Sequence, residues 1–373
     1  MQGKSIPPPT ITLYPRLWSW QNFLSILLGF AGMVFPASAF AAPQSEGPIS
    51  IDKHVRYVNC GSSNTLFNSI NKALATLDPS EDNTVYVNGA CQENVTITGF
   101  DRLKLIAQNG ASITDASGGV TIVVSITDSL RVSLQGFTIN GSGPSDQQDG
   151  LDCITSNCFF SGNTFQNAGD SANVVRGAHA YFNGDVFQDN SGGAGLFIGN
   201  NAYVLAMGIT TQRNGDAGVR IFASTLQILN STVQNNALAG ILAGVNSTVN
   251  IGHSTIMGNA GDGIQVQANG AANVSQTTIT GNGGDGIGVV DHSTLQLSAA
   301  RGIGNSITGN HGAGILIKDL SFARFSAPAS APNVVTGNGG VGGTDVLCSP
   351  QFPATRGVGA IVAAGGTTNC VEP

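Results

Sequence analysis

Aspartates precede several short apolar segments of this chain, and two of them have the spacing expected of a shared site. Asp262 and Asp285 each follow a glycine-containing turn and stand before a Gly-Ile pair. If each turn belongs to one unit of a stacked repeat, the two carboxylates lie about 5 Å apart. At that separation they could share a Ca²⁺ ion or act as a carboxylate pair. The competing interpretation is structural, because an aspartate in a Gly-Asp-Gly turn commonly hydrogen-bonds its own backbone.

A second group of side chains has the chemistry of sugar recognition. Phe197 and Phe222 provide aromatic rings on which a sugar can stack, and Arg220 carries the charge that a uronate carboxylate attracts. The alternative is that single Arg and Phe residues on a sheet are ordinary surface residues without a binding role. The remaining candidates for the same outward surface are Asp152, Arg176 and Gln265.

The sequence contains no complete catalytic set. Asp149 and Asp152 follow a loop, residues 141–148, that could overhang a binding surface, but no matching histidine and arginine elements come after them. A catalytic site needs a base, a group that neutralises charge and a substrate clamp close together. The catalytic residues therefore stay unassigned.

A periodic asparagine indicates the elements that must position these residues. From Asn167 onward an asparagine returns every 22 to 28 residues, usually at the end of a β-branched or aromatic run. A fixed period in this range is typical of a solenoid, in which each repeat covers the apolar face of the next. Stacked asparagines can also pass hydrogen bonds from coil to coil. The predicted ladder consists of Asn190, Asn214, Asn236, Asn259, Asn282, Asn310 and Asn338.

Each repeat has the pattern of short strands. In the unit that starts at Gly263, Ile264 and Val266 alternate with Gln265 and Gln267, and glycine recurs where a helix would break. We therefore predict an all-β fold, a single-stranded parallel β-helix with three strands per coil and about 23 residues per coil.

Composition agrees with this architecture. The chain has 51 glycines among 373 residues and only 10% charged residues, which suits many short strands joined by tight turns. The formal net charge of −7 argues against a nucleic-acid partner, because a phosphate backbone attracts a basic surface.

The N-terminal 41 residues resemble an export signal. Lys4 and Arg16 precede an uncharged apolar run, which ends at the small-residue pattern Ala39-Phe40-Ala41. The rival is a retained membrane anchor, because residues 23–42 are just long enough to span a bilayer. We expect cleavage after Ala41, no membrane contact afterwards, and a secreted, extracellular or periplasmic protein.

Six cysteines fit an exported chain. Their distribution favours three structural disulfides over a metal site, because none of them has the spacing of zinc ligands. Six cysteines allow many pairings, and we expect Cys60–Cys91, Cys153–Cys158 and Cys348–Cys370.

The chain is predicted to divide into a cap, a spiral and a second cap. An N-terminal cap over residues 42–84 contains an amphipathic helix over 64–77, which covers the open end of the solenoid. The β-helix then runs over 85–345, and a C-terminal cap or tail over 346–373.

The repeats resemble those of the right-handed parallel β-helix proteins of the pectin-lyase-like superfamily. The resemblance rests on units such as Gly-Asp-Gly263-Ile-Gln-Val and Thr-Ile-Thr-Gly-Asn282 and covers roughly residues 55–345. It is nearest to secreted bacterial members, whose activity the repeat does not imply. The resemblance implies that enzymes of this fold lyse, hydrolyse or epimerise acidic polysaccharides on an outward strand surface.

Two functional hypotheses follow. One is a non-catalytic secreted or cell-surface protein that binds extracellular polysaccharide or a surface partner along that strand surface. The other is a polysaccharide lyase, hydrolase or epimerase with its site on the same surface. Scarce and scattered charges favour the first hypothesis, Ca²⁺ is the only cofactor that the sequence suggests, and the oligomeric state stays open.

Overall fold

The computed structural model describes residues 52–63, 65–143, 148–299, 303–326, 332–339, 343–348, 354–356 and 366–370. The expected export signal, residues 1–41, lies outside them. None of the helices formed by the described residues has the length and apolar character needed to cross a membrane.

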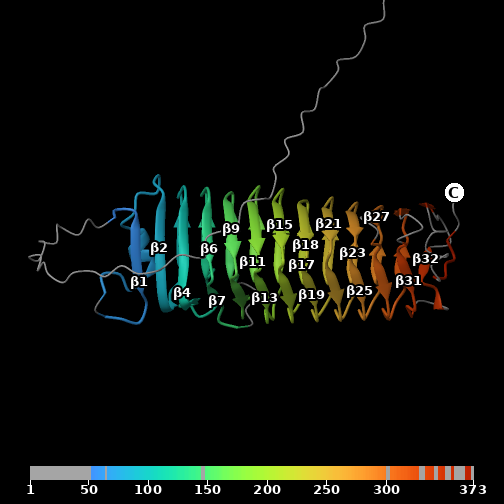
Figure 1. Cartoon of the computed structure of the whole chain (residues 1–373), viewed down its shortest axis with the longest axis horizontal. Helices are drawn as coiled ribbons and strands as arrows, with labels where there is room; N and C mark the ends of the chain where they lie inside the picture. The colour runs from blue at the N-terminus through green and yellow to red at the C-terminus, as the bar shows by residue number, and fades with distance from the viewer. Residues whose placement is uncertain are drawn as a thin grey trace, which may run out of the picture. The chain divides into compact units, whose positions relative to one another are not determined.

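The described chain winds as a parallel β-solenoid with three strands per coil, as the repeat predicts (Figure 1). The three strands of each coil lie on three faces. The first face is an 11-stranded sheet, and the second and third faces are joined in a 22-stranded sheet. Every named strand pair is parallel, and each strand pairs with its equivalents in the neighbouring coils, as β17 does with β14 and β20.

The strands of the first face are β3 Val95–Thr98, β5 Val124–Thr127, β8 Leu151–Ile154, β11 Ala172–Val175, β14 Leu196–Gly199, β17 Val219–Phe222, β20 Ile241–Gly244, β23 Ile264–Val266, β26 Ile287–Val289, β29 Ile315–Ile317 and β32 Val346–Cys348. Those of the second face are β1 Val55–Asn59, β2 Asn83–Gln92, β4 Leu103–Thr114, β6 Val132–Gln135, β9 Asn157–Ser161, β12 His179–Asn183, β15 Tyr203–Met207, β18 Thr225–Leu229, β21 Thr248–Gly252, β24 Ala271–Ser275, β27 Thr294–Ser298, β30 Phe322–Ser326 and β33 Ala354–Arg356. Those of the third face are β7 Thr138–Asn140, β10 Thr164–Gln166, β13 Val186–Gln188, β16 Thr210–Gln212, β19 Thr232–Gln234, β22 Thr255–Met257, β25 Thr278–Thr280, β28 Ser306–Thr308 and β31 Val334–Thr336. The long strands β2 and β4 reach around the corner between the second and third faces.

The core is the interior of the coil stack. Alternate residues of each strand point inward and are buried, as Ile264 and Val266 are in β23. Like residues stack between coils, with the rings of Phe160 and Phe182 4.7 Å apart. This continuous burial lets strands of three to five residues persist, because each coil is covered by its neighbours.

The periodic asparagines form one corner of the interior. Asn214 donates its Nδ2 and its backbone N–H to Asn236 Oδ1, and Asn236 does the same to Asn259 Oδ1. The chain of bonds starts at Asn190 and ends at Asn338, which donates to Asp345 Oδ1. All seven amides are buried, so each repeat supplies the hydrogen-bond partner that the previous one lacks. Asn167, in contrast, is exposed with φ 58°, and Ala168 occupies its place beside Asn190.

This ladder also explains the glycine that precedes the first-face strands. A Cβ on Gly263 would lie 2.9 Å from Asn282 Nδ2 and 2.6 Å from Gly286 O. Gly240 and Gly286 meet the next asparagine in the same way. The glycine is therefore required by close approach to the ladder.

Polar ladders line the other corners too. At the corner before the third face, Thr277 N–H donates to Asn305 Oδ1, and Asn305 N–H donates to Asn333 Oδ1. Asp185 occupies the equivalent position in a coil nearer the N-terminus. Its Oδ1 accepts hydrogen bonds from the backbone N–H and the side-chain Nδ2 of Asn163. The asparagine period did not reveal this ladder, because its members vary among Asn, Asp, Ser and Thr.

The N-terminal end is covered by a helix that is shorter than predicted. α1 spans Ile70–Leu74, with Ser69 as its N-cap, rather than residues 64–77. The preceding backbone pairs with the sheet instead, because Asn59 N–H donates to Phe67 O. Leu66, which lies within the predicted helix, is outside α1 and 85% exposed. Ile70, Ala73 and Leu74 are buried, so the short helix still covers the apolar end.

The stacked strands extend beyond both boundaries expected for the β-helix. At one end β1 already pairs with β2, and at the other β32 continues the first face beyond residue 345. The cysteines form three disulfides with the expected pairing, Cys60–Cys91, Cys153–Cys158 and Cys348–Cys370.

Candidate functional site

One row of outward positions crosses the first face and contains most of the proposed binding residues. The strand register aligns Asp152, Asn173, Phe197, Arg220, Leu242 and Gln265 on successive coils. Two residues farther along each strand, a second row aligns Val175, Gly199 and Phe222. We call the part of these rows on β8, β11, β14 and β17, together with the turns before them, the first-face site.

Two phenylalanine rings form the middle of the first-face site. The rings of Phe197 and Phe222 lie 6.0 Å apart at 46°. A Cβ on Gly199 would lie 2.9 Å from the Phe197 ring, and one on Gly244 would lie equally close to the Phe222 ring. Each ring therefore covers a glycine and lies close to the sheet. Such rings can offer a broad apolar surface to a flat ligand.

A basic group lies beside the second ring. The Arg220 guanidinium is 5.4 Å from the centre of the Phe222 ring and forms an ion pair with Asp216. Arg220 Nε and Asp216 Oδ1 are nevertheless buried and have no hydrogen-bond partner among the described residues. Unpaired buried polar atoms of this kind are uncommon in folded proteins.

Three carboxyl groups gather at the other end of the site. Asp149 and Asp170 occupy the same turn position on successive coils, and Asp152 is an outward residue of β8, three residues after Asp149. Burial raises the pKa of Asp149 to about 7, with further increases from the charges of Asp152 and Asp170. Burial also raises the pKa values of Asp152 and Asp170.

The Asp149 and Asp152 carboxyl groups are hydrogen-bonded to each other. Burial and the neighbouring negative charges favour the protonated form of this pair, so that the two carboxyl groups can share one proton. Asp152 is only 6% exposed, and its Oδ1 has no partner among the described residues; the same is true of Asn173 Oδ1 beside it. The pair combines an acid, a base and unused acceptors at one place on the sheet.

Arg176 is not in the row where the sequence placed it. It follows β11 in an exposed turn with φ 58°, and Val175 occupies the outward strand position instead. Its positive charge still acts on Asp152, where it partly counteracts the increase in pKa that burial causes. Gln265 keeps its place in the row but lies two coils beyond Arg220, where its Nε2 donates to Gln267 Oε1 at 3.1 Å.

Sequence reasoning missed Asp170 and Asn173. Asp170 precedes β11 as Asp149 precedes β8, so the repeat alignment was the signal that could have identified it. Asn173 was missed because the alternation of outward and inward residues in β11 could not be assigned from the sequence; the register aligns Asn173 with Phe197, and Val174 is buried.

Asp262 and Asp285 lie on successive coils, as their spacing indicates. Asp285 N–H donates to Asp262 Oδ1 at 2.8 Å, and Ala313 N–H donates to Asp285 Oδ1 at 2.7 Å. Each carboxylate thus anchors the turn of the next coil. Burial raises the pKa of Asp262 to about 6 and also raises that of Asp285.

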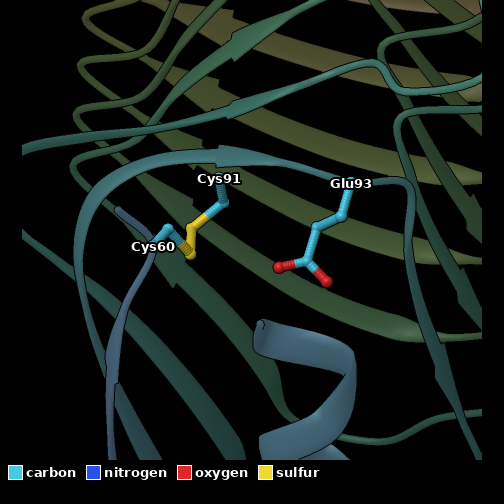
Figure 2. A group of neighbouring side chains, drawn as sticks. All are labelled: Cys60, Cys91 and Glu93. Atoms are coloured by element: carbon cyan, nitrogen blue, oxygen red, sulfur yellow. A yellow bond between two sulfur atoms is a disulfide. The ribbon is translucent and has the colours of Figure 1, made fainter. Parts of the chain in front are cut away.

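Among the described residues, one group of three side chains has the proximity of metal ligands, and it lies elsewhere. This group is Cys60, Cys91 and Glu93 (Figure 2). The two sulfurs are joined in a disulfide, so they cannot act as thiolate ligands. Glu93 accepts hydrogen bonds from Ile70 N–H and Ser69 Oγ at the start of α1. The group therefore joins the cap to the first coils.

Comparison with known proteins supports the fold. A family model described as the right-handed β-helix region matches residues 121–276. A periplasmic alginate epimerase, AlgG, has a similar structure with a TM-score of 0.50 and 11% identity, covering 85% of this chain and 83% of that one. The catalytic unit of a GH87 α-1,3-glucanase from Streptomyces thermodiastaticus reaches a TM-score of 0.55 at 14% identity, covering 90% and 70%. At these identities the similarity shows the fold alone. No curated protein matches the sequence.

Proposed function

We propose that this chain, whose fold is a right-handed parallel β-helix, binds an extracellular or periplasmic polysaccharide at the first-face site. The main support for this proposal is the pair of aromatic rings on adjacent coils, Phe197 and Phe222. These rings lie over Gly199 and Gly244, respectively. Sugar rings stack on such surfaces through their C–H groups, while hydroxyls bond to polar neighbours.

The neighbouring groups suit the polar part of a sugar. Arg220 and Asp216 lie at one end of the rings, and Asn173 and Asp152 at the other. All four side chains have a buried polar atom that has no partner among the described residues, and a ligand hydroxyl would pair with such an atom once its side chain rotates outward. A linear polymer running across the coils would contact acidic, aromatic and basic groups in turn.

The proposed location rests on independent features. Three disulfides form and persist in an oxidising compartment, and the N-terminal 41 residues resemble an export signal. The similar structures include a periplasmic enzyme that acts on alginate and a glucanase, so polysaccharide is the ligand class that both suggest.

Affinity electrophoresis of the mature chain through gels containing uronate or neutral polysaccharides tests the proposal. We expect at least one polymer to retard the protein, and Phe222→Ala to weaken that retardation about tenfold in apparent Kd, which corresponds to about 1.4 kcal/mol. Met257→Ala is the matched control, because Met257 is a partly exposed apolar residue on the third face. Equal retardation of the wild type and Phe222→Ala would contradict the proposal.

The shared proton of Asp149 and Asp152 favours a second candidate, an acid–base reaction on the bound polysaccharide. A carboxyl group with a pKa of about 7 can donate or accept a proton near neutral pH. After incubation with the retarding polymer, shortened or unsaturated chains, or epimerised residues, would support catalysis. The activity should be lost in Asp149→Asn, whereas retardation without altered polymer would support binding alone.

A further inference from the structure

A second cluster of aromatic side chains lies on a different face of the solenoid. On the second face, the register aligns Phe159, Tyr181 and Leu205 on β9, β12 and β15. One row away it aligns His179 with Tyr203, whose rings are 5.9 Å apart. These outward positions follow from strand alternation, because the residues between them, such as Phe160 and Phe182, are buried.

The aromatic cluster is accessible. Phe159 is 41% exposed and Tyr203 is 38% exposed, both among the exposed large apolar residues of the described chain. Tyr181 is half-buried, and its hydroxyl lies 3.6 Å from Met207 Sδ on the next coil. Rings are thus presented side by side on three adjacent coils, and none of them belongs to the first-face site.

The strands that continue from this cluster as far as β27 carry no charged side chain. Strands β9, β12, β15, β18, β21, β24 and β27 contain no Asp, Glu, Lys or Arg. Beyond Leu205 the same row consists of amides as far as β27, and Arg324 on β30 follows them. The row comprises Gln227, Asn250, Asn273 and Gln296. Asn273 Nδ2 donates to Asn250 Oδ1 at 2.8 Å, so the amides are themselves ordered.

We propose that this surface is a second glycan-binding site, specific for neutral polysaccharide. Phe159 and Tyr181 would stack on sugar rings, and the amide row would bond to hydroxyls as the polymer runs along successive coils. Amides can donate and accept at once, which matches the hydroxyl group. The proposal does not depend on the function of the first-face site, because the two sites share no residue.

The absence of charged side chains on these seven strands favours a neutral polysaccharide over a charged polymer as the ligand. A uronate polymer or a nucleic acid requires basic partners, and the seven strands provide none. A neutral glycan loses no charge solvation on contact with an uncharged face, and its hydroxyls replace the water bound to the amides. The first-face site differs here, because Arg220 and the aspartates give it charges of both signs.

A panel of neutral glucans, mannans, xylans and galactans, with alginate and pectate as charged comparisons, tests the inference by affinity electrophoresis. We expect a neutral polymer to retard the wild type, and Phe159→Ala and Tyr181→Ala each to weaken this binding about tenfold. Tyr57→Ala is the matched control, because Tyr57 is an exposed tyrosine on β1, outside the cluster. Unchanged thermal unfolding would show that the outward substitutions leave the fold intact.

Several results would overturn the inference. One is that no neutral polymer retards the wild type, and another is that both cluster variants bind as tightly as Tyr57→Ala. A third is a wild-type dimer in sedimentation that Phe159→Ala dissociates, since the cluster would then join two copies of the chain. Phe222→Ala separates the two proposals, because it should weaken binding at the first-face site and leave neutral-glycan binding by the second face unchanged.

Discussion

At the residue scale, the most informative group is the Asp149–Asp152 pair. Aspartates at the turn position of Asp149 commonly anchor the next coil, as Asp262 does through the Asp285 backbone. Asp152 has no such backbone role, because it is an outward strand residue with an unpaired buried oxygen. A carboxyl group placed there, with one buried oxygen that no described residue pairs, is typical of sites that act on ligands.

We predict that Asp152→Asn lowers the pKa of Asp149 from about 7. The variant removes a neighbouring negative charge and can donate a hydrogen bond to the Asp149 carboxylate, while burial still disfavours the charged form. Carboxyl ¹³C chemical shifts followed from pH 4 to 9 measure the change. Asp262→Asn serves as the control and should leave the Asp149 inflection in place. An inflection near pH 7 that survives in Asp149→Asn would show that the assignment to Asp149 is wrong.

Asp185 gives a residue-scale prediction about stability. It is fully buried, and burial raises its pKa to about 6 in the folded state, against 3.8 for an ordinary aspartate. Between pH 4 and 6 the folded state holds a proton that the unfolded state has released, so this group makes the protein less stable as pH rises. The full effect is on the order of 2–3 kcal/mol.

Asp185→Asn should therefore raise the free energy of unfolding at pH 7.5 by about 1–2 kcal/mol and change it little at pH 4. An amide fits this corner, since Asn305 and Asn333 occupy equivalent places. Urea unfolding at both pH values is the measurement. The control Asp189→Asn should act in the opposite direction at pH 7.5, because hydrogen bonds from Arg213 lower the pKa of Asp189. Equal effects of Asp185→Asn at both pH values would contradict the explanation.

At the element scale, the strands are too short to be stable alone, and the corners fix where each begins and ends. The asparagine amide takes its bonds from the neighbouring coil, and a glycine before most of the first-face strands, such as Gly263, allows the close approach. The identity of both residues is therefore determined by one contact, the close approach of the glycine to the asparagine amide of the next coil, which is repeated along the axis. This explains why Gly and Asn recur together at a fixed spacing, as Asn259 and Gly263 do.

We predict that Gly263→Ala lowers the free energy of unfolding by about 1–3 kcal/mol, the usual cost of overpacking. The added methyl group would displace Asn282 Nδ2 or Gly286 O, and neither belongs to a flexible side-chain end that can move into solvent. Gly61→Ala is the control, because nothing lies within 4 Å of its Cβ position. Denaturant unfolding of both variants measures the difference, and equal stabilities would show that the ladder tolerates the methyl group.

At the scale of the whole described chain, stability depends on how the coil stack ends. An open end exposes strand edges and apolar interior, which favours edge-to-edge association. α1 and Glu93 cover the N-terminal end, and the Cys60–Cys91 disulfide joins the first two strands of the second face. Near the C-terminal end, Asp345 completes the asparagine ladder by accepting from Asn338.

The disulfides should differ in their contribution to stability. Cys60 and Cys91 are 31 residues apart in sequence, whereas Cys153 and Cys158 are 5 apart. Because a longer closed loop removes more entropy from the unfolded chain, the Cys60→Ser/Cys91→Ser variant should lose about 1–2 kcal/mol more than Cys153→Ser/Cys158→Ser. Urea unfolding of the two double variants is the measurement, and the reverse order would show that native-state contacts outweigh the loop effect.

The sequence by itself determined the coil. Its asparagine period, its alternating strands and its six cysteines were enough to predict a three-stranded parallel solenoid with this disulfide pairing. The prediction was possible because every repeat contains the same local pattern of short strands and corner residues. The length of α1 was not determined in this way, because pairing of the Phe67 backbone with β1 overrides the local helical pattern. The same is true of Arg176, where a one-residue offset moves a side chain from the sheet surface into a turn.

Only the tertiary structure decided which distant residues meet. Asp149, Asp152 and Asp170 become one group through the register between coils, and the pKa of Asp149 depends on burial and on charges that no local pattern specifies. The neutral aromatic surface likewise arises from strands in three coils. Periodicity fixes the shape of one coil, whereas the alignment of each coil on the next fixes the chemistry of the surface, since neighbouring coils lie only about 5 Å apart.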